Sequence, residues 1–235
     1  AAASIVKSAL ESIGINIATH VLECANVQDK PFNDIKNEIL TIKSATFPVI
    51  DKAQGKKMQE KIEKAKADGD SVGGVTETAI IGLPEGVGEP WFDSVESILS
   101  HALFSIGGIK GVEFGNGFEM TKMRGSAAND AFALENGKVV TITNNNGGVN
   151  GGISNGMPLV LRTVVKPTPS IYKVQQTVDF AAKRNATLQI SGRHDPCILH
   201  RARVVQDSLV AFGLADLCGQ HFGTAWQEGA AWNMD

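Results

Sequence analysis

The sequence has few cysteines, no excess of basic residues and no long apolar run. Its three cysteines, Cys24, Cys197 and Cys218, are odd in number, lie far apart and match no zinc-binding spacing, so we expect reduced thiols. A net charge of −3 argues against a general nucleic-acid binder, which carries a basic face. No apolar stretch approaches the roughly 18 residues of a membrane span, and we expect no signal peptide. The chain is therefore expected to be cytoplasmic and to bind neither nucleic acid nor membranes.

The composition is that of an ordinary globular protein, with 43% hydrophobic and 20% charged residues in a chain of 235. No linker divides the chain, so we expect one domain over residues 1–235. It opens on three alanines and a serine without methionine and passes at once into a helical pattern that ends at Gly14. Because a natural protein rarely begins inside an uncapped helix, we expect this chain to be the C-terminal portion of a longer one.

The periodicity of the apolar residues predicts an α+β fold. The sequence lacks the full glycine-rich motif of a dinucleotide-binding domain. In the helix over 52–68, Met58, Ile62 and Ala65 form the apolar stripe. The last helix is expected to have Asp195 as N-cap and Pro196 as first residue, with an apolar face of Leu199, Ala202, Val205, Leu209 and Phe212. From Cys218 onward we expect a frayed tail. The other expected helices lie at 5–13 and 92–106, and the expected strands at 15–27, 72–83, 109–118, 159–165 and 187–190.

Residues 144–170 combine amides, glycines and rigid backbone in one stretch. Asn145 and its two asparagine neighbours supply amide donors and acceptors, and Gly151 is one of five glycines that permit tight turns or close approach to a flat ligand. The buried strand at 159–165 then delivers Lys166, Pro167, Thr168, Pro169 and Ser170. A cation, two hydroxyls and a stiff turn suit a phosphate or other anion. A glycine-rich hairpin followed by an exposed loop explains the pattern equally well.

Two further groups of residues have both a functional and a purely structural interpretation. Arg193, His194 and Asp195 place a cation, an imidazole and a carboxylate before a helix, which indicates either an anion-binding end with a proton-transfer group or a simple cap. Gly107 and Gly108 are either a helix C-cap or a place where a ligand ring meets bare backbone. The remaining four histidines are scattered, so we expect packed or surface residues and no metal site.

Four segments in this order and spacing resemble chorismate synthases, the last enzymes of the shikimate pathway. They are Gly73–Asp93 with its Gly-Val-Gly-Glu-Pro turn, Lys110–Gly115, Asn144–Ser170 and Gly192–Cys197. The resemblance covers nearly the whole chain apart from residues 28–68 and the tail. It implies a lyase that eliminates phosphate from 5-enolpyruvylshikimate 3-phosphate by a trans-1,4 route, with reduced FMN and no net redox change. The family's catalytic histidines and substrate-binding arginines have no counterpart among the motifs of this chain.

The resemblance also implies a fold, an assembly and a set of site residues. The fold is a β-α-β sandwich in which two antiparallel sheets enclose long helices, and the assembly is a homotetramer. Asp195 would lie beside the flavin edge as the proton-transfer group. No separate NADPH domain is visible, so NADP-linked reduction of the flavin is expected to come from outside. A flavin-binding module without lyase activity, an inactive fragment and a degenerate structural homologue are the alternatives. The implied flavin-binding positions are Gly107, Gly108, Asn145, Gly151, Lys166, Pro167, Thr168, Pro169, Ser170 and Arg193.

Overall fold

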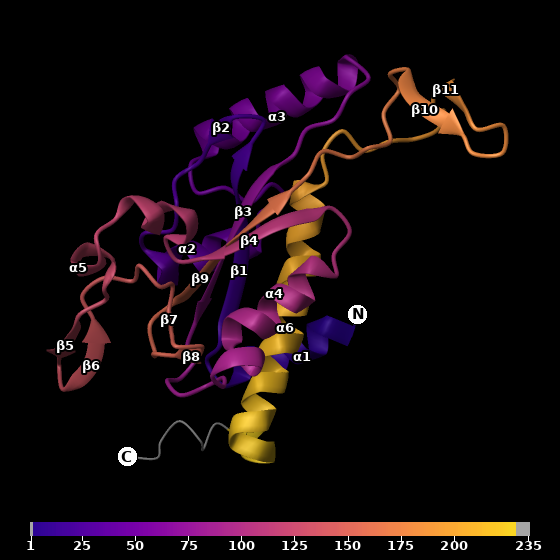
Figure 1. Ribbon diagram of the computed structural model, residues 1–235. Coiled ribbons are helices and arrows are strands. Elements are labelled where there is room, and N and C mark those ends of the chain that lie inside the picture. Colours follow the sequence, from indigo (N-terminus) through magenta and orange to yellow (C-terminus); the bar gives the residue numbers. More distant parts are fainter. Residues whose placement is uncertain (1, 229–235) are drawn as a thin grey trace.

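The computed structural model describes residues 2–228, which form an α+β fold with antiparallel sheets, as the sequence predicts (Figure 1). Five strands make up the main sheet in the order β2-β1-β3-β9-β4, and each neighbouring pair is antiparallel. Strands β1 and β3 are buried along most of their length, so both faces of the sheet are covered there. The bounds are β1 Asn16–Cys24, β2 Val27–Gln28, β3 Gly74–Ile81, β4 Ile109–Phe114 and β9 Leu159–Val165.

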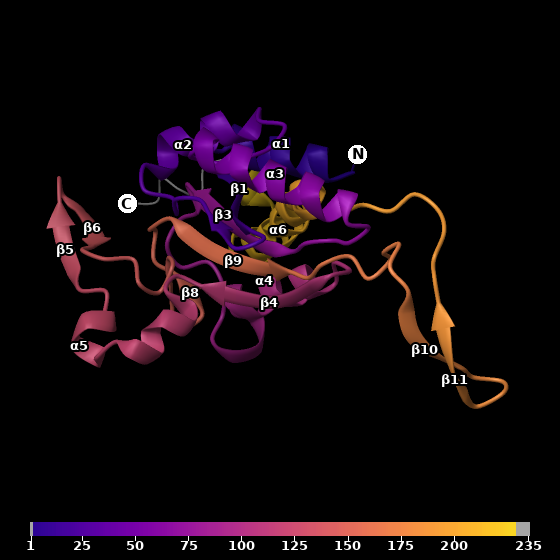
Figure 2. The same ribbon diagram turned by 90° about the horizontal axis from the view of Figure 1, so that it is seen from above.

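Three helices cover one face of the sheet: α1 (Ala2–Ser12), α4 (Val95–Phe104) and α6 (Leu199–Phe222). Helix α6 contacts β1, β3 and both other helices, and Figure 2 shows it end-on between α1 and α4. The main core lies in this layer, where Ile80 and Leu161 from the sheet meet Leu99 and Leu214 from the helices. All four side chains are fully buried, so the strands and these helices are stabilised by one shared apolar interface.

Two more helices lie elsewhere on the sheet. Helix α2 (Ile35–Lys43) packs Ile39 and Ile42 against Ala18 and Ala79 on the opposite face, although no period predicts this helix in the sequence. Helix α3 (Lys52–Ala67) confirms the predicted stripe, because Met58 and Ala65 are buried and Ile62 packs beside them. Among residues 2–228, no helix combines the length and the apolar character needed to cross a membrane.

Leu199 and Ala202 are buried on α6 as predicted, but the rest of its buried face differs from the predicted one. Val205 and Phe212 are 46% and 43% exposed, whereas Gln206 and Asp207 are buried against the sheet. The Thr19 hydroxyl donates to Asp207 at 2.6 Å, and polar atoms of the sheet thus replace the apolar partners that periodicity assumes. The prediction of a frayed tail from Cys218 onward is also wrong, because the helix continues to Phe222 and Cys218 is fully buried. Residues 229–235 lie outside the described range.

Helix α4 begins later than predicted. Residues Trp91–Asp93 form a separate turn, and the Ser94 hydroxyl accepts a hydrogen bond from the Ser97 amide at 3.0 Å. Ser94 is therefore the N-cap. Because the cap follows this turn, the helix loses its expected first turn.

Two hairpins project from the body on opposite sides (Figures 1 and 2). One is β5–β6 (Phe132–Glu135 and Lys138–Thr141), preceded by the short helix α5 (Gly125–Ala128). The other is β10–β11 (Gln175–Asp179 and Arg184–Leu188), of which the sequence indicates only a short strand at 187–190. Its base is closed: the Tyr172 hydroxyl donates to the Gly192 carbonyl at 2.6 Å, and Gln189 donates to the Tyr172 carbonyl at 2.9 Å.

Candidate functional site

A hollow of about 250 Å³ lies where β9 ends, β4 begins and α6 follows. Helix α4 ends at Phe104, and Gly108 adopts a φ of +101° that lets the chain turn into β4. The Lys166 amide then donates to the Gly108 carbonyl at 2.9 Å, which joins the two segments. Six of the predicted positions thus line one hollow together with Ile198: Gly107, Gly108, Lys166, Pro167, Thr168 and Pro169.

The chemistry of this hollow suits an anion. Lys166 is exposed and carries an ammonium group, and the Thr168 hydroxyl oxygen is buried without a hydrogen-bond partner in the described chain. The Ser71 hydroxyl donates to the Thr168 carbonyl at 2.6 Å and thereby fixes the backbone of this turn. A buried hydroxyl without a partner is costly, so a ligand oxygen is a natural partner for it. An FMN phosphate fits this set of donors.

Asp195 lies in the loop before α6 but does not cap the helix. The helix begins at Leu199 with Ile198 as N-cap, so the predicted cap at Asp195 and the predicted start at Pro196 are both wrong. The Pro196 carbonyl instead accepts from the Val72 amide at 2.8 Å, which keeps this loop extended beside β3. The Asp195 carboxylate forms an ion pair with Arg201, and the predicted Arg193 is exposed.

The loops at 166–170 and 192–198 are neighbours. Ser170 lines a small hollow with Tyr172, His194 and Pro196, next to the larger one. The rings of Tyr172 and His194 meet edge to face with centroids 4.9 Å apart, and the His194 Nε2 atom is buried without a partner in the described residues. The ion pair with Arg201 restricts how the Asp195 carboxylate is presented.

Two predicted positions lie at the other end of β9. The Asn145 amide N–H donates to Asp130 at 2.7 Å, and its side-chain oxygen accepts from Asn116 at 2.6 Å. Gly151 forms the turn between β7 (Val149–Asn150) and β8 (Ile153–Ser154) with a φ of +61°. Neither residue lines the hollow at Lys166. The glycine-rich hairpin of the alternative reading is therefore present at Gly151, and the structure does not bring it to the candidate site.

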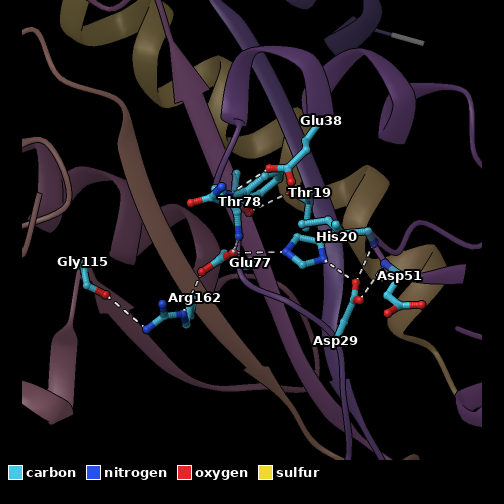
Figure 3. Close-up of polar contacts among 12 residues, drawn as sticks. Thr19, His20, Asp29, Glu38, Asp51, Glu77, Thr78, Gly115 and Arg162 are labelled. Carbon is cyan, nitrogen blue, oxygen red and sulfur yellow. Dashed lines mark hydrogen bonds and ion pairs between the residues drawn. The ribbon is translucent and has the colours of Figure 1, made fainter. Parts of the chain in front are cut away.

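A buried charge network crosses the middle of the sheet (Figure 3), and no sequence motif indicates it. The His20 Nδ1 atom lies 3.3 Å from Asp29 Oδ2, and its Nε2 atom lies 3.1 Å from Glu77 Oε2. Arg162 Nε donates to the other Glu77 oxygen at 2.9 Å. The available signal was a histidine and a glutamate inside apolar strands, where charged residues are rarely buried unless paired.

The charges of this network support one another. Burial opposes protonation of His20, but its contacts with Asp29 and Glu77 outweigh burial and raise its pKa. Burial alone would raise the pKa of Asp29, yet His20 and the backbone N–H groups of Asp51 and Ile50 lower it. Glu77 behaves in the same way: His20, the Phe32 N–H and Arg162 together lower its pKa against the effect of burial. The network therefore ties the segment before α2 to the sheet.

Comparison with known proteins decides the family. The family model for chorismate synthase matches residues 1–218, which is most of the chain. The chain belongs to the chorismate synthase family. It is 44% identical over 217 residues to the chorismate synthase of Methanosarcina mazei and 44% identical over 210 residues to that of Thermococcus kodakarensis. These alignments cover 92% and 89% of this chain but only 59% and 58% of the two relatives.

The fold agrees with this assignment. A solved structure described as the crystal structure of chorismate synthase superposes with a TM-score of 0.77 at 27% identity, covering 94% of this chain and 62% of that one. The segments that carry the chorismate synthase resemblance lie around β3, β9 and β4. A Cβ at Gly74 would lie 1.9 Å from the Glu23 carbonyl oxygen, and one at Gly115 would lie 2.1 Å from that of Asn145. Glycine at these positions is thus required by close backbone approach.

Proposed function

We propose that the protein to which this chain belongs converts 5-enolpyruvylshikimate 3-phosphate to chorismate and phosphate with reduced FMN. The observation that carries the proposal is the hollow at the end of β9, where Lys166, the partnerless Thr168 hydroxyl and the Gly107–Gly108 backbone come together. Membership of the chorismate synthase family supports the reaction. The chain spans about three fifths of the curated relatives, so the rest of the reaction site is expected from segments outside it.

The residues of the hollow suggest how FMN would be held. Lys166 would neutralise the flavin phosphate, Thr168 would donate its hydroxyl hydrogen to a phosphate oxygen, and Pro167 and Pro169 would keep both groups in place. Bare backbone at Gly107 and Gly108 leaves room for a ring. Ser170 and Arg193 would bind at the neighbouring loop. Asn145 and Gly151 remain predicted flavin-binding positions, although they lie at the other end of β9.

When bound beside Lys166 and Thr168, reduced FMN would supply electron density for the loss of phosphate from the substrate. Asp195 would hold or pass on a proton at its carboxylate oxygen, beside the loop that borders the hollow. Arg193 would bind a carboxylate of the substrate or a polar group of the flavin. Because Arg201 contacts Asp195, the reaction requires this ion pair to open or to share the carboxylate. We propose an external reductant for the flavin, in a cytoplasmic homotetramer.

The proposal is tested by anaerobic assay of the full-length protein. Chorismate and phosphate should form in equal amounts only when FMN is reduced. Lys166→Ala should weaken FMN binding roughly 10- to 100-fold, because a hydrogen bond to a charged group contributes about 1.5–3 kcal/mol. Lys173→Ala is the matched control, since Lys173 pairs with Asp70 at the hairpin base and does not line the hollow.

The alternatives give different results in the same assay. A flavin-binding module would perturb the flavin spectrum and lose affinity in Lys166→Ala, yet would form no chorismate. A structural homologue would leave the flavin spectrum unchanged. Turnover supported by NADPH alone, without an added reductase or chemical reductant, would contradict the external source of electrons.

A further inference from the structure

Residues 69–73 link α3 to β3 and pack against the chain that follows β9 (Figure 1). The Ser71 hydroxyl donates a hydrogen bond to the Thr168 carbonyl at 2.6 Å. A Cβ at Gly73 would lie 2.3 Å from the Val165 carbonyl oxygen, so bare backbone meets bare backbone there. A segment far away in the sequence therefore borders the turn that carries the candidate anion-binding groups.

Ser71 is held in place from the side of α3. That helix ends in a turn in which Gly69 has a φ of +66° and its amide donates to the Lys66 carbonyl at 3.1 Å. The Asp70 amide donates to the Ala65 carbonyl at 2.8 Å. These two bonds with a left-handed glycine make up a Schellman motif, which fixes the direction in which the chain leaves a helix. Ser71 follows directly and starts from a defined position.

Ser71 is also held from the side of β3. The Val72 amide donates to the Pro196 carbonyl at 2.8 Å, on the loop that carries Asp195. Val72 comes directly after Ser71, and the Cα atoms of adjacent residues lie about 3.8 Å apart. The donor to Thr168 is thus fixed relative to the loop of Asp195, and it cannot follow the turn if the turn moves.

The carbonyl that Ser71 binds controls the geometry of the turn. Thr168 lies between Pro167 and Pro169, and a proline nitrogen carries no hydrogen. The peptide group between Thr168 and Pro169 can therefore form hydrogen bonds only through the Thr168 carbonyl. By binding this oxygen, Ser71 fixes the peptide plane and with it the ψ angle of Thr168, whose hydroxyl is buried without a partner in the described chain.

We propose that Ser71 is a positioning residue for FMN: it holds Thr168 so that the threonine hydroxyl faces the flavin phosphate. The inference rests on the proposed function. Ser71 does not line the hollow at Lys166, so it acts through Thr168 and not by touching the flavin. Without the Ser71 hydroxyl the turn is free to rotate, and FMN must order it on binding, which lowers the affinity.

The first test is FMN affinity in the full-length protein, measured by anaerobic titration. Ser71→Ala should bind FMN roughly tenfold more weakly, which corresponds to about 1.4 kcal/mol. Ser71→Thr keeps a hydroxyl and should restore most of the affinity. Unchanged affinity in Ser71→Ala, or an equal loss in Ser71→Thr, would overturn the proposal.

Ser208→Ala is the matched control for this titration. The Ser208 hydroxyl also donates to a backbone carbonyl at 2.6 Å, that of Val204, but it lies on α6 and does not line the hollow. We expect this variant to bind FMN like the parent. A loss equal to that of Ser71→Ala would show that any serine bond of this kind matters, which contradicts a positioning role.

A double-mutant cycle separates positioning from a general loss of order. Thr168→Val removes the threonine hydroxyl but keeps the carbonyl that Ser71 binds, so it should weaken FMN binding by itself. In the Thr168→Val background, Ser71→Ala should hardly weaken binding further, because the group that it positions is already gone. Additive losses would contradict action through the Thr168 hydroxyl.

Hydrogen exchange tests the ordering of the turn without FMN. In Ser71→Ala the amides of residues 168–172 should exchange faster than in Ser208→Ala, whereas those of β3 should not change. If exchange rises but the parent binds no FMN, the proposed function fails and the ordering by Ser71 stands. If the parent binds FMN and Ser71→Ala changes neither exchange nor affinity, the positioning role is wrong and the proposed function stands.

Discussion

At the residue scale, the ion pair between Asp195 and Arg201 changes how substitution of the carboxylate is interpreted. A capping role is excluded by the start of α6 at Leu199, so any effect of Asp195→Asn reports on the ion pair or on catalysis. We expect this variant to lower turnover of the full-length enzyme by roughly 10²- to 10⁴-fold, as for a general acid–base group, with FMN affinity nearly unchanged. Stopped-flow turnover and anaerobic FMN titration measure the two quantities.

Arg201→Gln provides the matched control, because it breaks the same contact from the other side. Both partners are partly exposed, and such a surface pair contributes only about 0–1 kcal/mol. We expect its melting temperature to change little and its turnover to stay within a few-fold of the parent. Equal and small effects of the two variants on turnover would reduce Asp195 to a surface ion-pair partner.

A second residue-scale prediction concerns pH. The raised pKa of His20 means that its charge stabilises the fold fully below the unfolded value near 6.5, and this contribution is lost as pH rises through the folded pKa. The lowered pKa values of Asp29 and Glu77 act oppositely: their contribution is lost on acidification below the ordinary values of 3.8 and 4.5. We expect the network to stabilise the protein most between about pH 4.5 and 6.5.

His20→Asn tests this expectation. It leaves buried carboxylates without their cation and should cost about 3–5 kcal/mol near pH 6, the usual effect of breaking a buried pair. The variant should also lose the decline in stability above pH 6.5, measured by urea unfolding from pH 4 to 9. His101→Asn is the control, since His101 is exposed on α4. An unchanged slope in His20→Asn would mean that other groups cause the alkaline decline.

At the element scale, the strands and most helices follow from the sequence because their apolar residues repeat with the right period. Helix α3 ends at Ala67 with Gly69 at a φ of +66°, as the pattern predicts. The missed α2 covers its sheet face with only Ile39 and Ile42, too few residues for a visible period. The predicted buried face of α6 is wrong in part because the polar side chains of Gln206 and Asp207 are buried against hydroxyl groups of the strands.

Two glycines inside α6 give an element-scale prediction. A Cβ at Gly213 would lie 2.8 Å from Leu99 Cδ2 on α4, whereas one at Gly219 would meet nothing closer than Trp226 at 3.8 Å. Alanine favours the helix by about 0.5–1 kcal/mol at either position. At Gly213 the crowding of a buried leucine costs about 1–3 kcal/mol and offsets that gain.

Gly219→Ala should therefore raise the free energy of unfolding, and Gly213→Ala should lower it or leave it unchanged. Denaturant titration of both variants in one background checks the difference. The close packing of α4 on α6 would be disproved if Gly213→Ala were the more stable of the two.

The site illustrates what sequence can and cannot predict at this scale. Local sequence patterns indicate Lys166–Pro169 and Gly107–Gly108 as binding positions. The fold brings them together because β9 and β4 are neighbours in the sheet. Asn145 was named from the same stretch as Lys166, but the length of β9 separates them. The His20 network joins residues far apart in the sequence, so only the fold reveals it.

At the scale of the whole molecule, exposed apolar side chains lie on the helical layer. Val205 and Phe212 share one side of α6, Ile5 on α1 is 74% exposed, and Phe104 at the end of α4 is 53% exposed. Exposed apolar surface of this kind marks a contact with other protein. We expect residues 1–235 expressed alone to self-associate without a defined size, and the full-length protein to form one defined oligomer.

Multi-angle light scattering over a range of concentrations compares the two. The double substitution Val205→Glu with Phe212→Glu should reduce association of residues 1–235, whereas Phe180→Glu on the distant β10–β11 hairpin serves as the control for the added charge. A monodisperse monomer of residues 1–235 would show that the helical layer is stable in water as it is.

Because the base of the β10–β11 hairpin is closed, the length of the hairpin does not affect the positions of the two loops that it connects. Tyr172 is hydrogen-bonded to both Gln189 and Gly192 across its neck, so the residues beyond the neck do not set the spacing between Ser170 and Asp195. Chain can be added there at an entropic cost that grows only with the logarithm of its length. We therefore expect the tip of the hairpin to tolerate an inserted tag or reporter without a change in this spacing.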